Sequence, residues 1–205
     1  RQAKNFGDLA LNDSKGCGTI MRVAPVAFLA TPEMVEETAL ETSALTHGHR
    51  TGQEAAAAWA LILFAVLAGE SVENAASAMI HRFGRETSEA LRAALSAPRD
   101  GLPETVETLG GGWIAEEALS IALYAVLAAR DLEEGLRIAV THSGDSDSTG
   151  AIAGNLLGLL YPEQVMNHRW RAQIECPDVI DRLARDLVAS SRGCAEELFD
   201  RYPGF

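Results

Sequence analysis

The sequence predicts an all-α protein, and three features of the chain support that prediction. Apolar residues recur at helical spacing in most segments, and capping residues stand in front of several of them. Two strands of alternating polarity joined by a tight turn are not found in the sequence. The 205 residues are 47% hydrophobic and 22% charged, a mix that one core can organise, so we expect a single domain over residues 1–205.

Four helices are predicted in the first half of the chain. Thr31, Pro32 and Glu33 supply an N-cap, a proline at the first helical position and an acid in the first turn, so a helix should run from here to about residue 45. The other helices are expected over residues 53–67, 71–81 and 86–95. The first of these three is apolar nearly all round, which is typical of a helix buried within an α-domain.

A long connection and four further helical segments are predicted in the second half. Pro103 and the three glycines Gly110–Gly112 predict that residues 100–112 connect two helices without forming one. Asp131 is expected to cap a short helix. Helices are expected over residues 115–129, 132–140, 149–160 and 179–202, the last with a break near Gly193.

Charge and cysteine usage exclude several classes of protein. Seventeen Lys and Arg against 29 Asp and Glu give a net charge of −12, which disfavours nucleic acids and anionic membrane surfaces as partners. Cys17, Cys176 and Cys194 lack CxxC spacing, so we expect neither a disulfide framework nor a thiolate zinc site. No leader follows Arg1 and no segment is apolar enough to span a bilayer, so we expect a soluble, cytoplasmic protein.

An acidic segment at the mouth of the 149–160 helix has the composition of a metal site. Asp145, Asp147, Ser148 and Thr149 place two carboxylates and two hydroxyls within five residues, and such oxygen ligands favour Mg²⁺, Mn²⁺ or Ca²⁺ over zinc. An EF-hand does not fit, because Leu156 stands where its bidentate glutamate is needed. The alternative is that Asp147 or Ser148 only caps the helix.

A glycine-rich segment near the N-terminus is a candidate anion cradle. Gly16 and Gly18 flank Cys17 and can expose consecutive N–H groups, with Lys15 and Arg22 as countercharges. The spacing is not that of a P-loop or a dinucleotide fingerprint, and a plain tight turn is the alternative.

The roles of two histidines and one tryptophan stay open. His47 and His142, each after a threonine, could be structural residues at helix ends, and Trp113 could stack on a ligand ring or belong to the core.

Four motifs, taken in order, resemble the ADP-ribosylglycohydrolase family, which includes the enzyme that removes ADP-ribose from dinitrogenase reductase. The resemblance covers residues 4 to 161. The motifs are the glycine-rich segment Ser14–Pro25, Thr46-His47 followed by residues 52–67, Gly110–Trp113 followed by residues 115–127, and Gly144–Gly150 followed by the small-residue helix 151–158. The fold implied by the resemblance is a globular domain of orthogonally packed helices.

The resemblance implies a role for each matching residue. Asp145, Asp147 and Ser148, the last at a position where the family often has Thr, would supply half of a site for two Mg²⁺ or Mn²⁺ ions, with Asp145 and Asp147 also catalytic. Cys17 replaces an Asn that is common in some relatives. The residues implied in binding the diphosphate, the distal ribose and the nucleotide are Ser14, Lys15, Gly16, Cys17, Gly18, Met21, His47, Gly110, Gly112 and Trp113.

The resemblance also implies an activity and an incomplete site. The expected activity is metal-dependent hydrolysis of the N-glycosidic bond between ADP-ribose and a protein side chain, arginine first. The family's upstream Thr-Asp-Asp motif and catalytic Glu have no match here, so we expect a fragment of a longer enzyme, a site completed by a partner chain, or a truncated inactive relative. Two other functions stay open: a non-catalytic, crystallin-like protein, and a metal hydrolase acting on another ADP-ribose compound or a phosphorylated small molecule.

Overall fold

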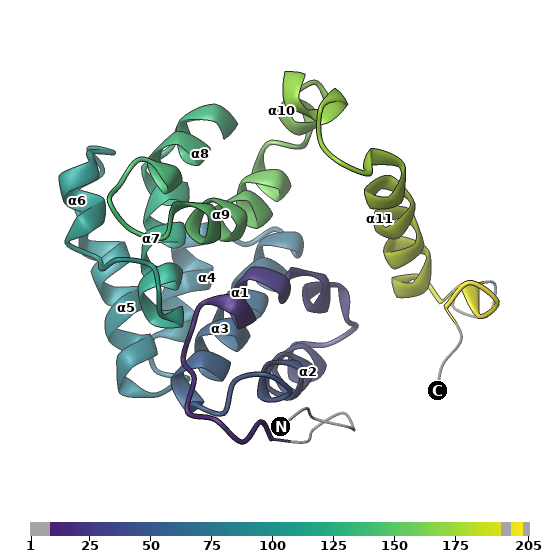
Figure 1. Ribbon diagram of the computed structural model, residues 1–205, viewed down its shortest axis with the longest axis horizontal. Helices are drawn as coiled ribbons and strands as arrows, with labels where there is room; N and C mark the ends of the chain where they lie inside the picture. The colour runs from purple at the N-terminus through teal and green to yellow at the C-terminus, as the bar shows by residue number, and fades with distance from the viewer. Residues whose placement is uncertain (1–8, 194–197, 203–205) are drawn as a thin grey trace.

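The computed structural model describes residues 9–193 and 198–202, and in these ranges the chain is helical with no strand (Figure 1). The predicted all-α class is confirmed. The only β-type pairing among these residues is an isolated bridge between Gly16 and Ile114. The elements are α1 (Gly18–Arg22), η1 (Ala24–Phe28), α2 (Pro32–Ala44), α3 (Arg50–Leu67), α4 (Val72–Met79), α5 (Arg85–Ser96), α6 (Pro103–Glu107), α7 (Ala115–Ala128), α8 (Leu132–Val140), α9 (Ser146–Leu160), α10 (Pro162–Met166), η2 (Arg169–Ala172) and α11 (Pro177–Ser191).

Side-chain caps fix the starts of several helices where the sequence predicts them. The Thr31 hydroxyl accepts a hydrogen bond from the Met34 N–H (3.3 Å) at the start of α2. The Asp131 carboxylate accepts one from the Glu134 N–H (2.8 Å) at the start of α8. Each cap satisfies an N–H group that has no partner within its own helix, so the helix begins at a defined residue.

Two alanine-rich helices, α3 and α7, form the centre of the domain. Every residue from Ala55 to Ala60 in α3 is fully buried, and so are most residues of α7. The small side chains let neighbouring helices approach closely: α1, η1, α2 and α4 pack on α3, while α5, α8 and α9 pack on α7 (Figure 1). Trp59 and Tyr124 fill the space between backbones, and both belong to the core.

Several predicted boundaries differ from the structure; α3, for example, begins at Arg50, three residues before the predicted start. The connection over residues 100–112 contains α6, which begins after Leu102 because Pro103 suits the first helical position. α9 begins at Ser146, three residues before the predicted start, because Asp145 is fixed as its N-cap by a backbone contact to another segment. The helix predicted to begin at residue 179 begins at residue 177 and ends at residue 191, and the break predicted near Gly193 is present, where a φ of 88° is left-handed.

The C-terminal helix α11 stands apart from the bundle (Figure 1). An apolar groove of about 930 Å³ lies between α11 and the surface formed by η1, α3 and α9. Leu183 on α11 is therefore half exposed, although its helix is amphipathic. No helix in the described ranges combines the length and the apolar character needed to cross a bilayer.

Because α7 lies at the centre of the core, truncating one of its side chains should greatly lower the free energy of unfolding. Leu119 is fully buried, so Leu119→Ala should lower the free energy of unfolding by about 3 kcal/mol. Leu183→Ala is the matched control on the half-exposed face of α11, and should cost less than about 1 kcal/mol. Urea denaturation of both variants measures the difference. Equal losses would show that α7 is not the centre of the core.

Candidate functional site

Three motifs that lie far apart in the sequence meet at one place. We call them the glycine loop (residues 14–18), the glycine run (residues 110–113) and the acidic turn (residues 145–149). The bridge between Gly16 and Ile114 joins the first two: the Cys17 N–H donates to the Trp113 carbonyl (3.2 Å), and the Ala115 N–H donates to the Lys15 carbonyl (2.9 Å). The Asp145 N–H donates to the Gly111 carbonyl (2.8 Å), which joins the acidic turn to the same backbone.

A hydrogen bond between two side chains joins the glycine loop directly to the acidic turn. The Cys17 thiol donates to Oδ2 of Asp145 at 3.3 Å, and both residues are only 8% exposed. Burial raises the pKa of Cys17, so the group is a thiol and a donor. Burial would also raise the pKa of Asp145, but hydrogen bonds, first of all from Cys17, hold it below the usual aspartate value. The carboxylate is therefore charged and held towards the glycine loop.

The acidic turn is the first turn of α9. Asp145 is the N-cap, but its side chain does not cap the helix, and Asp147 and Ser148 lie inside the first turn. The alternative that Asp147 or Ser148 caps α9 is therefore wrong. Thr149 is fully buried; its hydroxyl lies 2.7 Å from the Ala139 carbonyl and 3.0 Å from Nε2 of His142. Thr149 and His142 thus join α8 to α9, and the structural role expected for a histidine at a helix end fits His142.

The donor set of the acidic turn suits part of a hard-cation site. Asp145 and Ser148 are buried, whereas Asp147 is exposed, and all three offer oxygen atoms. Two carboxylates and one hydroxyl are fewer than the six oxygen ligands such ions take. Within the described part of the chain, the acidic turn included, no group of three or more His, Cys, Asp or Glu side chains is placed to hold a metal. The described residues therefore fit an incomplete Mg²⁺ or Mn²⁺ site.

His47 lies against the glycine loop. A methyl group added at Gly16 or at Gly18 would lie 3.5 or 3.4 Å from atoms of the His47 ring. Nδ1 of His47 is 2.8 Å from the Thr46 hydroxyl, which accepts a hydrogen bond from Arg22 (2.6 Å). Burial, and then the charge of Arg22, lower the pKa of His47. The ring is therefore neutral at pH 7 and lies beside the loop.

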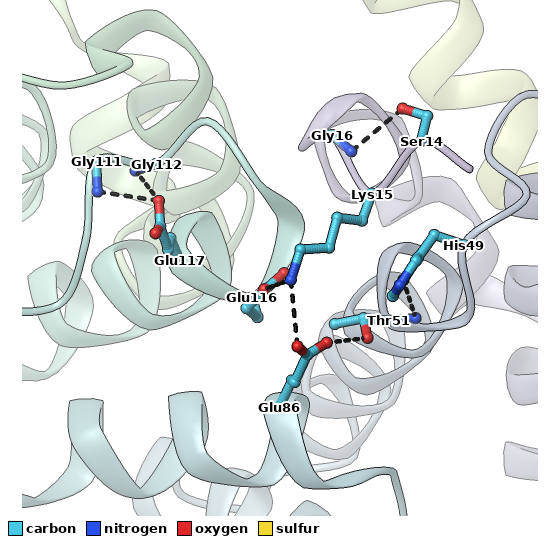
Figure 2. Close-up of polar contacts among 10 residues, drawn as sticks. All are labelled: Ser14, Lys15, Gly16, His49, Thr51, Glu86, Gly111, Gly112, Glu116 and Glu117. Atoms are coloured by element: carbon cyan, nitrogen blue, oxygen red, sulfur yellow. Dashed lines mark hydrogen bonds and ion pairs between the residues drawn. The ribbon is translucent and has the colours of Figure 1, made fainter. Parts of the chain in front are cut away.

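Lys15 points away from Gly16 and Ser14 (Figure 2). Its ammonium forms ion pairs with Glu116 and with Glu86, the latter at 3.3 Å. The charge that the family resemblance implies for the ligand's diphosphate is thus engaged by two carboxylates of the protein. The sequence did not reveal these two partners, because Glu86 and Glu116 lie 71 and 101 residues from Lys15 along the chain.

The glycine run forms a tight wall in front of α7. Gly110 and Gly112 have φ values of 122° and 78°, which side-chain-bearing residues rarely adopt. The N–H groups of Gly111 and Gly112 donate to Oε2 of Glu117 at 3.0 and 3.1 Å (Figure 2). Trp113, which follows them, is 65% exposed. Trp113 is therefore not a core residue, and stacking of its indole on a ligand ring stays the prediction for it.

Met21, also implied in binding, is half-buried in α1.

The environment of His47 predicts its titration. Its NMR titration midpoint should lie below 6.5, because burial and Arg22 disfavour the imidazolium. Between that midpoint and 6.5, the unfolded chain binds a proton that the folded chain does not, so His47's contribution to stability falls as the pH drops through this range. In Arg22→Gln the midpoint should rise only in part, since burial is the larger cause. A wild-type midpoint at or above 6.5 would contradict the described environment.

The backbone conformation of Gly112 predicts that a substitution there destabilises the fold. Gly112→Ala places a methyl group 2.8 Å from Cγ2 of Thr149 and adds left-handed strain, so it should destabilise the fold by about 1–3 kcal/mol. Gly158→Ala in α9 is the control: nothing lies within 4 Å of its added methyl group, and the change should stabilise by about 0.5–1 kcal/mol. Urea denaturation of both variants measures the change in the free energy of unfolding. A neutral Gly112→Ala would mean that the glycine run and the acidic turn are not in close contact.

Comparison with known proteins identifies the family. The family model described as ADP-ribosylglycohydrolase matches residues 1–197. An uncharacterized protein of Archaeoglobus fulgidus is 28% identical over 182 residues, which cover 85% of this chain and 58% of that protein. A chain in the solved structure of an ADP-ribosylglycohydrolase-related protein complex is 27% identical, with a TM-score of 0.70 over 86% of this chain and 61% of its own length.

This chain thus spans about three fifths of the length of these two relatives. The family model, however, matches nearly all of it, and the solved relative has the same helical fold. The chain belongs to the ADP-ribosylglycohydrolase family.

Proposed function

We propose that the protein hydrolyses the bond between ADP-ribose and a modified protein side chain, with the N-glycosidic linkage to arginine as its substrate. The observation that carries the proposal is the convergence of the glycine loop, the glycine run and the acidic turn, joined by the hydrogen bond from Cys17 to Asp145. A cradle of backbone groups beside a cluster of carboxylates suits a ligand that combines a diphosphate with a ribose.

Each part of the site has a proposed share in binding. The glycine loop would line the diphosphate and the distal ribose through Ser14, Gly16 and Gly18, since the Cys17 N–H is already engaged by the Trp113 carbonyl. His47, neutral and packed on the loop, would contact the nucleotide. The exposed indole of Trp113 would stack on a ring of the ligand, with Gly110 and Gly112 shaping the wall behind it.

Asp145, Asp147 and Ser148 would hold Mg²⁺ or Mn²⁺. Such a cation, when bound, lowers the pKa of a coordinated water and orients it for attack. Asp145 is held for this task by Cys17, and Asp147 projects into solvent from the same turn. We propose that the remaining ligands and the acid/base carboxylate come from the part of the relatives' length that this chain does not span, or from a partner chain. ADP-ribosylated protein is the proposed partner, in a reducing cytoplasm where Cys17 stays a thiol.

One observation favours a second candidate, a non-catalytic protein that keeps the family fold. The described ranges contain no group of three His, Cys, Asp or Glu side chains placed to hold a metal ion. A protein of this kind would bind no divalent cation at the acidic turn, and Mn²⁺ would not change its stability.

Asp147 provides the test of the proposed function. With Asp147→Asn, the Mn²⁺-dependent release of ADP-ribose from an arginine-linked substrate should fall at least about 100-fold, because a direct ligand matters more than the outer-shell groups that change metal affinity 10–100-fold. Calorimetric titration with Mn²⁺ should show the same loss of affinity. Serine-linked and acetyl-ester-linked ADP-ribose are assayed alongside to identify the linkage.

Asp178→Asn is the matched control, because Asp178 is also an exposed acid in the first turn of a long helix, α11. It should leave release and Mn²⁺ affinity unchanged. Full activity of Asp147→Asn would remove Asp147 from the metal site. A wild-type protein that neither binds Mn²⁺ nor releases ADP-ribose, even with the segment or partner chain that supplies the remaining ligands present, would support the non-catalytic candidate.

A further inference from the structure

Three helices begin at one point of the molecule, and the side chain of Lys15 lies between them (Figure 2). Thr51, Glu86 and Glu116 are the second residues of α3, α5 and α7, respectively. Helix N-termini carry a partial positive charge, which favours the carboxylates of Glu86 and Glu116 at these positions. The meeting of two carboxylates nevertheless leaves a local excess of negative charge, which a cation can compensate.

Lys15 supplies that cation. Its ammonium pairs with Glu116 and, at 3.3 Å, with Glu86; the Thr51 hydroxyl donates to the other oxygen of Glu86. The side chain of Lys15 is 26% exposed and that of Glu116 is 11% exposed, so this pair is only weakly screened by water. The hydrogen bond to Glu116, more than any other contact, raises the pKa of Lys15.

Glu116 depends on this partner. Its Oε2 is buried and has no hydrogen-bond partner among the described residues, so the ammonium of Lys15 is the group that compensates the carboxylate. Removing the ammonium would leave a buried charge without compensation, which is strongly unfavourable. The loop residue and the first turn of α7 are therefore coupled through their side chains.

The backbone of Lys15 is fixed as well. Its carbonyl accepts from the Ala115 N–H (2.9 Å), and a methyl group added at Gly52 would lie 3.2 Å from its Cα. Cys17, two residues further on, donates its thiol hydrogen to Asp145. Lys15 thus lies where the glycine loop attaches to the scaffold, and the residues after it face the acidic turn.

We propose that Lys15 is the positioning residue of the glycine loop, which anchors the loop to the starts of α5 and α7 through Glu86 and Glu116 and does not bind the ligand's diphosphate. The anchor holds Cys17 against Asp145. Only the consequence for ligand binding rests on the proposed function; the anchoring itself is independent of any substrate.

The reactivity of Cys17 tests the anchor without a ligand. In a Cys176→Ser, Cys194→Ser background, Cys17 is the remaining thiol, and its burial should make alkylation by iodoacetamide slow. Lys15→Met should raise the alkylation rate at least about tenfold, because the loop opens more often. Lys15→Arg keeps the cation and should stay within about twofold of the parent. Glu86→Gln, a milder change, should give an intermediate rate.

Arg50→Met is the matched control, because Arg50 pairs with Glu54 within α3, its side chain is 87% exposed, and it takes no part in the ion pairs of Lys15. Its Cys17 alkylation rate should equal that of the parent. An unchanged rate in Lys15→Met would overturn the proposal.

A double variant separates anchoring from simple charge compensation. Lys15→Met should lower the Tm by roughly 5 °C or more, since it leaves Glu116 uncompensated. Lys15→Met with Glu116→Gln removes that charge and should recover most of the Tm, while Cys17 stays reactive because the loop has lost its anchor. A double variant with parental Cys17 reactivity would overturn the proposal, since Lys15 would then only neutralise Glu116.

Calorimetric titration with ADP-ribose completes the test. Lys15→Met should weaken ADP-ribose binding only in proportion to the opening that alkylation of Cys17 reports. A loss of ADP-ribose affinity with unchanged Cys17 reactivity would mean that Lys15 contacts the diphosphate, against the proposal. If the parent protein binds no ADP-ribose, the proposed function fails, and the Cys17 rates still decide the role of Lys15.

Discussion

The backbone bridge between Gly16 and Ile114 is the interaction on which the site depends, since it joins two segments about one hundred residues apart. Residues of the glycine loop before α1 form no helix, so their N–H and C=O groups need partners from elsewhere. The backbone in front of α7 supplies them for Lys15 and Cys17. The same stretch accepts the Asp145 N–H through Gly111, so the acidic turn is positioned on a backbone that the first contact has already fixed.

Helix starts account for the concentration of acidic groups around this bridge. Glu86, Glu116 and Asp147 each occupy the second position of a long helix, where the helix dipole stabilises a negative charge. Lys15 pairs with the first two. No basic side chain in the described ranges pairs with Asp147. In a protein of net charge −12, Lys15 thus compensates the carboxylates at two of these helix starts, and the third carboxylate has no basic partner in the described ranges.

Periodicity and capping predicted the long helices, because both act within a few residues of sequence: Thr31 caps α2 and Asp131 caps α8, as expected. The start of α9 was not predictable in this way, since the contact that fixes Asp145 comes from Gly111. The resemblance named the motifs of the site, and the structure brings them together. The resemblance could not predict which way the Lys15 side chain points, because its partners Glu86 and Glu116 lie 71 and 101 residues away in the sequence.

Lys15 and Arg22, the two countercharges that the sequence offers to the glycine loop, are both committed to the protein, and this limits how an anionic ligand can be held. Lys15 is paired with Glu116 and Glu86, and Arg22 donates to the carbonyls of Gly18 (3.1 Å) and Thr42 (3.0 Å) and to the Thr46 hydroxyl. The surrounding net charge of −12 opposes the approach of a diphosphate. Backbone N–H groups offset only part of that repulsion, so a divalent cation at the acidic turn would supply the rest. In the proposed function, the metal therefore contributes to binding ADP-ribose as well as to activating water, and loss of the metal should weaken binding before any chemistry occurs.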